Sequence, residues 1–288
     1  MATSERGSRD TRLARLADGT FDLLIIGGGI TGAGLAREAA LAGLRTALVE
    51  RHDFASGTSS RSSRLVHGGV RYLEHGHVGL VFESSQERRR LLTLAPHLVR
   101  PLAFTWPVYQ GARVPRWKLR AGLALYDALA LFRNVGRHEG LSRDDVLRRE
   151  PALDPHGLAG GARYWDAATD DSRLTLLTVL GAAEAGAGSD SVLCNHVAVV
   201  RGLHDGSRVV GAVVRDTLAD GHGAHDIPVR ARVVVNGLAG RSAAARAAGV
   251  RHFVLLSAIC VQKPLLAFGM LGAGLMGERY PAQVWWGT

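Results

Sequence analysis

Runs of apolar and polar residues change pattern along the chain, and the first pattern is the most informative. A continuous apolar run over Leu23–Ile26 is typical of a strand covered on both faces. Three glycines follow it, and an apolar stretch over Ile30–Leu41 then has the length of a helix. A second apolar run over Thr46–Glu50 ends in an acid. This order predicts a buried strand, a tight turn, a helix and a second strand.

The middle of the chain has helical patterns. The pattern over Glu83–Ala95 predicts a helix, and we expect its three successive arginines, Arg88, Arg89 and Arg90, on a solvated face. A second predicted helix, Arg116–Phe132, is basic at its start and apolar nearly all round. That composition is compatible with a helix lying in a membrane interface, but a buried core helix is the favoured interpretation.

The next segments alternate between strand and helix patterns. Tyr164–Leu174 predicts a strand that leads into a helix over Leu174–Ala187, with Asp170 and Asp171 interpreted as N-caps of that helix rather than as catalysts. Short alternating stretches predict further strands at Val192–Val200, Arg208–Arg215 and Val229–Val235.

The glycines after the first strand have a spacing with a known physical use. Gly27, Gly29 and Gly32 form a G-x-G-x-x-G pattern between a strand and a helix, which is typical of a dinucleotide-binding turn. Glu50 ends the second strand, where a carboxylate accepts hydrogen bonds from ribose hydroxyls and repels a 2′-phosphate. The segment therefore predicts FAD or NAD binding and disfavours NADP. The alternative is a glycine turn that only packs a helix on a strand.

Composition narrows the class of protein. The chain has 288 residues, 47% of them hydrophobic and 21% charged, as in an ordinary globular protein. Its formal charge of +9 favours an anionic partner. The sequence has no dense Lys/Arg block interleaved with aromatic residues of the kind that binds nucleic acid, so we do not expect a nucleic-acid partner. The two cysteines, Cys194 and Cys260, lack metal-like spacing, and we expect no metal site and free thiols in a reducing compartment.

The chain shows no targeting or membrane-spanning pattern. Residues 1–20 are polar and lack the apolar core of a secretory signal, so we expect a disordered leader. The longest apolar window, Phe253–Met276, is interrupted by Gln262, Lys263 and Pro264 and is not expected to span a bilayer.

A loop rich in hydroxyl groups follows Glu50. Six serines and threonines lie between Ser56 and Ser63, and Arg61 and Arg64 accompany them. Such a loop suits phosphates and flavin carbonyls, while a flexible polar linker is an equally good interpretation of the spacing. The loop leads into the sequence His67-Gly-Gly-Val-Arg-Tyr-Leu-Glu74.

With this sequence the chain resembles the FAD-dependent glycerol-3-phosphate dehydrogenases, which belong to the flavoenzymes typified by D-amino-acid and sarcosine oxidases. The likeness runs from about Phe21 to Asn236. It includes Ala95–Leu98, Ala121-Gly122, Tyr126-Asp127 and Asp170–Leu174. The glycine pattern alone indicates a dinucleotide, and the Ser/Thr loop with His-Gly-Gly-x-Arg-Tyr-Leu is the more specific part.

The resemblance implies roles for particular residues. The ADP half of FAD is then held by Gly27, Gly28, Gly29, Thr31, Gly32 and Glu50. The route to the isoalloxazine is lined by Thr58, Ser59, Ser62, Ser63, Arg64, His67, Gly68 and Gly69, with His67 and Gly68 beside the ring. Val197 lies where a backbone amide meets adenine, and Arg64 stands where a lysine is common. Arg71 and Tyr72 reach toward the substrate phosphate.

The resemblance also implies a fold, a reaction and partners. The fold class is α/β, a Rossmann-like FAD-binding domain with an inserted α+β substrate region, incomplete at the C-terminus. The expected parts are a leader over 1–20, FAD-binding segments over 21–95 and 164–240, an inserted region over 96–163 and an atypical tail over 241–288. The reaction is oxidation of sn-glycerol 3-phosphate at C2 to dihydroxyacetone phosphate, with electrons passed to a quinone or another acceptor. We expect a cytoplasmic protein, peripheral at the inner face of the membrane.

The chain departs from the family pattern after its last predicted strand. It has Asn236-Gly-Leu-Ala-Gly-Arg-Ser where the family has Asn-Ala-x-Gly-Pro-Trp, and no later segment carries the active-site histidine. We therefore expect a C-terminally truncated member without detectable turnover, whose catalytic base is unknown. The alternatives are a related FAD-dependent amine or hydroxy-acid oxidase, or a non-catalytic flavin-binding fragment. The second G-x-G-x-x-G spacing, Gly272–Gly277, is interpreted as coincidence.

Overall fold

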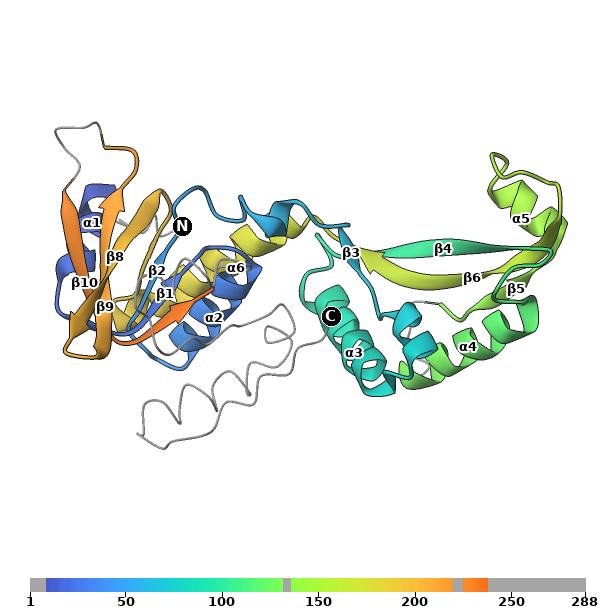
Figure 1. Cartoon of the computed structure of the whole chain (residues 1–288), viewed down its shortest axis with the longest axis horizontal. Helices are drawn as coiled ribbons and strands as arrows, with labels where there is room; N and C mark the ends of the chain where they lie inside the picture. Colours follow the sequence, from blue (N-terminus) through green and yellow to red (C-terminus); the bar gives the residue numbers. More distant parts are fainter. Residues whose placement is uncertain (1–8, 132–135, 220–224, 238–288) are drawn as a thin grey trace. The chain divides into compact units, whose positions relative to one another are not determined.

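The structure is a computed structural model, which describes residues 9–131, 136–219 and 225–237. The chain divides into two compact units (Figure 1). Of the described residues, unit 1 contains those up to Arg61 and those from Asp171 onward, and unit 2 contains those from Ser62 to Asp170. The sequence-based division placed its boundaries near 95 and 163 instead, and the functional roles given to those parts stay predictions.

Unit 1 is built on a six-stranded sheet with the order β7-β2-β1-β10-β9-β8. The first four strands in this order are parallel, and β9 and β8 extend the sheet as an antiparallel hairpin. The strands are β1 (Thr20–Ile26), β2 (Thr46–Val49), β7 (Val192–Cys194), β8 (Val197–Asp205), β9 (Arg208–Asp216) and β10 (Asp226–Asn236).

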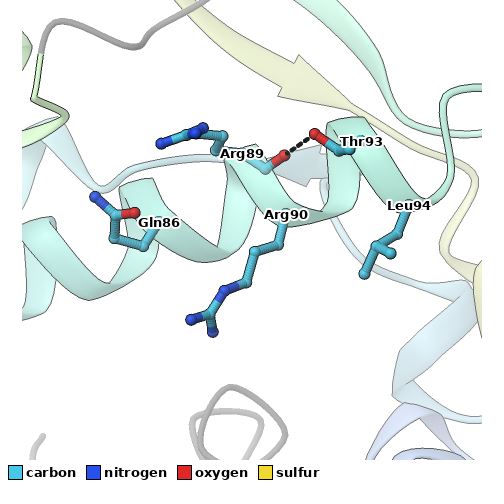
Figure 2. Close-up of a pocket in the computed structure, with 5 residues that line it drawn as sticks. All are labelled: Gln86, Arg89, Arg90, Thr93 and Leu94. Carbon is cyan, nitrogen blue, oxygen red and sulfur yellow. Dashed lines mark hydrogen bonds between the residues drawn. The ribbon is translucent and has the colours of Figure 1, made fainter.

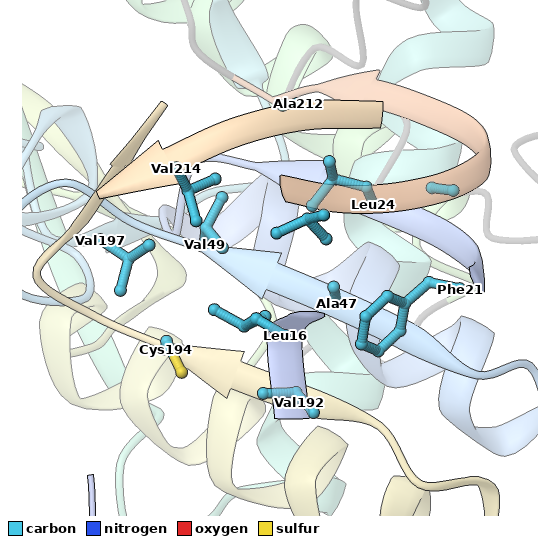
Figure 3. Close-up of a cluster of buried hydrophobic side chains, with 12 residues drawn as sticks. Leu16, Phe21, Leu24, Ala47, Val49, Val192, Cys194, Val197, Ala212 and Val214 are labelled. Carbon is cyan, nitrogen blue, oxygen red and sulfur yellow. The ribbon is translucent and has the colours of Figure 1, made fainter. Parts of the chain in front are cut away.

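Both faces of this sheet are covered. Helices α2 (Ile30–Leu41) and α6 (Asp171–Ala185) pack on one face, where Leu23 and Ile25 of β1 are buried. On the other face Leu24 of β1 joins an apolar cluster that also takes in residues of β2, β7, β8, β9 and β10 (Figure 3). Because successive strand residues point to opposite faces, one continuous apolar run supplies both cores.

The second core corrects the expectation of a disordered leader, which is wrong for residues 9–20. Arg9–Ala17 forms helix α1, and its Leu16 is fully buried against the sheet (Figure 3). Arg9 donates hydrogen bonds to the carbonyl groups of Asn195 and His196, at 3.0 Å each, and is paired with Asp216 at 2.6 Å. Leu13 also packs against this core, while Ala14 and Ala17 are exposed, so the helix is anchored by two leucines that composition alone does not reveal.

Unit 2 is an antiparallel sheet backed by helices. Strand β6 (Leu158–Ala168) pairs with β4 (Arg100–Tyr109) along its length and with the short strands β3 (Leu65–Val66) and β5 (Glu139–Leu141). A core containing Val81, Leu123 and Tyr126 lies between the sheet and the helices. These helices are α3 (Val78–Leu94) and α4 (Arg116–Leu129), while α5 (Arg143–Arg149) packs near one end of β6.

The structure confirms the α/β fold class and most predicted elements. Helix α2 and strand β2 match the predicted segments closely, and α4 is a core helix that buries Leu119, Leu123 and Tyr126. Helix α3 begins five residues before the predicted start at Glu83. The described ranges also contain 3-10 helices that the pattern did not predict, namely η1 (Thr58–Ser60), η2 (Val70–His75) and η3 (Gly186–Ser189). The predicted tail lies outside the described residues.

Candidate functional site

The glycine turn of unit 1 has the geometry that its spacing requires. Gly27 has a φ of +109°, a conformation that side chains rarely allow, and its N–H donates to the carbonyl oxygen of Val49 at 2.9 Å. A Cβ at Gly32 would collide with the carbonyl oxygen of Gly27. The first turn of α2 therefore lies directly on the end of β1, and glycine is required at both positions.

Glu50 is tied to this turn by its carboxylate. Its Oε2 accepts a hydrogen bond from the N–H of Gly28 at 2.7 Å, and its Oε1 accepts one from the N–H of His52 at 2.9 Å. A Cβ at Gly28 would lie 2.8 Å from the Cβ of Glu50, so glycine lets the two segments approach. The acid that was predicted to meet a ribose thus lies beside the turn that was predicted to meet the pyrophosphate.

The N-terminus of α2 is capped by a residue from the hydroxyl-rich loop. The N-cap residue of this helix is Gly29, which has no side chain to offer. Ser59 of η1 supplies the missing acceptor, because its Oγ accepts the hydrogen bond from the N–H of Ile30 at 2.9 Å. Thr31 is half-buried in the first turn, and Thr58 is exposed beside Ser59. The loop that follows Glu50 is therefore ordered against the helix at this end and is not a free linker.

The backbone at Val197 is already engaged. Its N–H donates to the carbonyl oxygen of Glu50 at 2.7 Å, and the Glu50 N–H donates to the carbonyl oxygen of Cys194 at 2.9 Å. These bonds fasten Glu50, at the end of β2, to the last residue of β7 and the first residue of β8. A contact of Val197 with adenine stays a prediction, and its N–H is not open for it in this structure.

The predicted flavin loop of unit 2 changes direction at two residues in the left-handed region. Arg64 has a φ of +58° and Gly69 a φ of +75°, and the short strand β3 lies between them. The N–H of Arg64 donates to Ser62 Oγ at 3.0 Å, and its carbonyl accepts from Thr169 at 3.0 Å. A left-handed arginine is uncommon and marks a constrained backbone. Ser62, Ser63 and Arg64 are exposed.

The residues predicted to meet substrate follow in η2. Arg71 is exposed and Tyr72 is 37% exposed, and the Tyr72 ring lies 6.4 Å from that of His67, which is also exposed. Glycine is required at Gly69 because a Cβ there would collide with the Tyr72 ring. Burial is the main cause that raises the pKa of Tyr164 to about 12. The charge of Asp166 raises this pKa further, and the charge of Arg71 lowers it.

A buried polar cluster made of Arg88, Tyr126 and Asp166 lies against Gly68. Tyr126 Oη donates to Asp166 Oδ1 at 2.6 Å, and Arg88 donates to the Tyr126 hydroxyl at 2.6 Å and forms an ion pair with Asp166. The N–H of Gly68 donates to the same Asp166 oxygen at 2.9 Å. Burial is the main cause of a strongly raised pKa of Tyr126. The hydroxyl therefore stays protonated and donates.

This cluster corrects one expectation. The prediction that Arg88 lies on a solvated face is wrong, because only 3% of its side chain is exposed. Its neighbours Arg89 and Arg90 are exposed, as predicted. They line a shallow hollow of about 330 Å³ with Gln86, Thr93 and Leu94 (Figure 2). All five residues come from α3, and Arg90 is ion-paired with Glu87, so the hollow is the outer side of one helix.

The predicted site residues fall into two groups. The turn, Glu50, Thr58, Ser59 and Val197 belong to unit 1. The residues from Ser62 to Tyr72 belong to unit 2. Within each unit the structure brings the predicted residues close together. The buried cluster was missed, since its members are separated by up to 78 residues and no local pattern joins Arg88 and Tyr126 to Asp166.

Comparison with known proteins identifies the class. The family model for FAD dependent oxidoreductases (DAO) matches residues 22–262. The chain therefore belongs to this family of FAD-dependent oxidoreductases.

Particular relatives narrow the likeness. The chain is 41% identical over 233 residues to the alpha-glycerophosphate oxidase of Streptococcus pneumoniae, covering 80% of this chain and 37% of the relative. It is 47% identical over 187 residues to the glycerol-3-phosphate dehydrogenase of Synechocystis sp., covering 65% of this chain and 33% of the relative. The solved glycerol-3-phosphate dehydrogenase of Bacillus halodurans, complexed with FAD, is 33% identical with a TM-score of 0.63, covering 84% of this chain and 38% of that one. The chain thus spans between 33% and 38% of the length of these relatives.

Proposed function

We propose that the chain binds FAD and that the whole protein oxidises sn-glycerol 3-phosphate to dihydroxyacetone phosphate. The observation that carries this proposal is the 41–47% identity to relatives named for oxidation of this substrate. The identity extends over 187 to 233 residues and is far above what a shared fold alone would give.

The residues of unit 1 fit a dinucleotide. A side chain at Gly32 would collide with the turn and one at Gly28 would meet Phe54 and Glu50, and α2 begins there without a capping side chain of its own. The positive end of a helix favours a phosphate group. Glu50, held at 2.7 Å from the Gly28 N–H, would accept from ribose hydroxyls. Bound FAD would supply the hydride acceptor, which no amino acid side chain provides.

Unit 2 would supply the substrate contacts. The exposed guanidinium of Arg71 can donate two parallel hydrogen bonds to a phosphate dianion, and Tyr72 can add a third donor. The protein's net positive charge favours the same anion. The catalytic base is not assigned to any described residue.

The test begins with the visible spectrum of the purified chain after FAD is added and excess removed. Flavin bands retained by the protein would support the cofactor assignment, and a colourless protein would overturn it. The loaded protein is then titrated anaerobically with sn-glycerol 3-phosphate, sarcosine and a D-amino acid. Saturable bleaching or perturbation of the bands by glycerol 3-phosphate alone supports the substrate assignment. A response only to an amine would favour the related oxidase, and no response at all would leave a flavin-binding fragment.

The role of Arg71 has its own variant. Arg71→Gln removes the forked donor, and the affinity for glycerol 3-phosphate should fall about tenfold or more, because charge-assisted hydrogen bonds are lost. Arg89→Gln, which removes a guanidinium from the outer side of α3, is the matched control and should leave the affinity unchanged. Equal losses in both variants would point to overall charge instead of a specific contact.

The electron acceptor and the location complete the proposal. We infer a quinone or another acceptor, and peripheral contact with the cytoplasmic face of the membrane. None of the helices in the described ranges is both long and apolar enough to cross a bilayer. Helix α4 exposes Trp117 (72%) and Leu125 (46%) beside the exposed cations Lys118 and Arg120, a composition that suits an anionic interface.

Vesicle sedimentation tests the membrane contact. Binding to vesicles with anionic lipid should exceed binding to neutral vesicles and should fall in Trp117→Ser. The control is Leu41→Ser, which removes an exposed apolar side chain from a different helix, α2. If the Trp117→Ser variant and the unaltered chain sediment equally with the vesicles, α4 is not the membrane contact.

A further inference from the structure

The buried cluster of Arg88, Tyr126 and Asp166 is directed at one point of the predicted flavin loop. A single carboxylate oxygen, Asp166 Oδ1, accepts from the Tyr126 hydroxyl, from Arg88 and from the backbone N–H of Gly68. The three residues come from β6, α4 and α3, and none of them is more than 3% exposed. An oxygen that accepts from three donors fixes the position of each of them.

The Gly68 backbone lies directly on this cluster. A Cβ at this position would collide with the Tyr126 hydroxyl and would come within 2.8 Å of Arg88 Nη1 and 2.7 Å of Ser85 Oγ. The loop is thus constrained in two ways here. The hydrogen bond to Asp166 sets the direction of the Gly68 N–H, and the buried side chains beneath Gly68 limit how closely its backbone can approach them. Gly69, with its φ of +75°, passes the chain on to Arg71 and Tyr72 immediately afterward.

We propose that Arg88, Tyr126 and Asp166 are positioning residues for the segment His67–Gly69. The inference rests on the proposed function, because that segment is expected beside the isoalloxazine ring. The cluster acts through the loop and touches no reacting atom. Its ion pair balances the two charges locally, so its effect is on where the backbone lies and not on the net charge near the flavin.

An alternative is that the cluster only stabilises unit 2. The two differ in what an altered cluster would disturb. If the cluster only stabilises unit 2, altering it would loosen the sheet and the loop together. If the cluster positions the loop, altering it would release the Gly68 N–H first, because that hydrogen bond joins Asp166 directly to the loop backbone.

Amide hydrogen exchange without FAD separates these readings. Tyr126→Phe removes one of the three donors and keeps the ring, and Asp166→Asn removes the charge and keeps an oxygen. We expect exchange at Gly68 to rise severalfold in the first and about tenfold or more in the second, as suits the loss of a charge-assisted bond. Residues 102–108 of β4 should keep their protection in Tyr126→Phe.

Ser85→Ala is the matched control. Its Oγ is buried at the same place but has no hydrogen-bond partner among the described residues. Removing it should leave exchange at Gly68 unchanged. Unchanged exchange in both cluster variants, or equal acceleration in β4 and at Gly68, would overturn the proposal.

The flavin gives the second readout. Tyr126→Phe should weaken FAD binding by about three- to tenfold and alter the shape of the visible bands, while Ser85→Ala should do neither. An unaltered affinity and spectrum in Tyr126→Phe, with Gly68 exchange raised, would overturn the link to the cofactor. If the unaltered chain binds no FAD, the proposed function fails, yet the exchange result still decides whether the cluster holds the loop.

Discussion

Glu50 Oε2 accepts a hydrogen bond from the N–H of Gly28 at 2.7 Å, and so joins the end of the second strand to the turn after the first. Both partners are close to where the ADP half of FAD is expected. The other carboxylate oxygen accepts from His52, so each oxygen has its own donor. This arrangement requires a carboxylate and not only a polar side chain.

Glu50→Gln should weaken FAD binding about tenfold, as expected for losing one hydrogen bond to a charged group. An amide has one oxygen, so either Gly28 or His52 must face its NH₂ group. Titration of the chain with FAD measures the change. Glu38→Gln, which alters a carboxylate paired with Arg37 on α2, is the control. An equal loss in the control would show that the effect comes from overall charge.

Gly32→Ala should destabilise unit 1 and abolish FAD binding. The new Cβ meets a backbone carbonyl, which cannot turn away as a side chain can, so we expect a loss near the upper end of about 1–3 kcal/mol. Urea unfolding measures it. Gly188→Ala, where no heavy atom lies within 4 Å of the new Cβ, should show no such loss. A stable Gly32→Ala protein would contradict the close approach of α2 to the turn.

Arg88→Met should cost about 3–5 kcal/mol of the free energy of unfolding, because Asp166 is left as a buried charge without its counter-ion. Arg89→Met removes the next guanidinium along the helix, which is exposed, and should change stability by less than about 0.5 kcal/mol. Denaturant midpoints of the two variants make the comparison. Similar midpoints would mean that Arg88 is solvated after all.

The anchor of α1 predicts a pH dependence. The hydrogen bond from Arg9 is the main cause of a lowered pKa of Asp216 in the folded chain. A carboxyl whose pKa is lower when folded stabilises the protein above its unfolded pKa of about 3.9, and this contribution is lost as the pH falls through the folded value.

The unaltered chain should therefore have a higher free energy of unfolding than the Asp216→Asn variant at pH 7. This difference in stability should disappear as the pH falls below about 4. Thermal unfolding between pH 7 and pH 2.5 follows this difference. Asp205→Asn, at the exposed end of β8, should show no comparable change with pH. If the difference in stability stays constant down to pH 2.5, the effect comes from the change in side-chain packing and not from the ionisation of Asp216.

The sequence predicted the elements whose signals are local. Helix α2 and strand β2 were predicted nearly to the residue, because Gly27 and Gly32 permit only one kind of turn, while β1 begins three residues before the predicted apolar run at Leu23. Helix α1 was missed because a polar segment can bury a single side chain such as Leu16 without any visible periodicity.

The buried cluster was missed for a different reason. Three successive arginines look alike in a sequence, and helix geometry sends only one of them inward. What makes Arg88 that one is Asp166, which lies 78 residues later on β6, and no local pattern joins them. Hydroxyl-rich loops pose the same difficulty, since only the fold shows that Ser59 caps α2.

The central place of β10 also has a consequence for the order in which the chain can be assembled. Strand β1 pairs with β10 in a register that joins Thr20 to Arg230, so the first strand waits for residues made some 210 positions later. The residues of unit 2, by contrast, form a continuous stretch that leaves the ribosome well before them. During synthesis the glycine turn after β1 therefore remains beside an open sheet edge until β10 arrives.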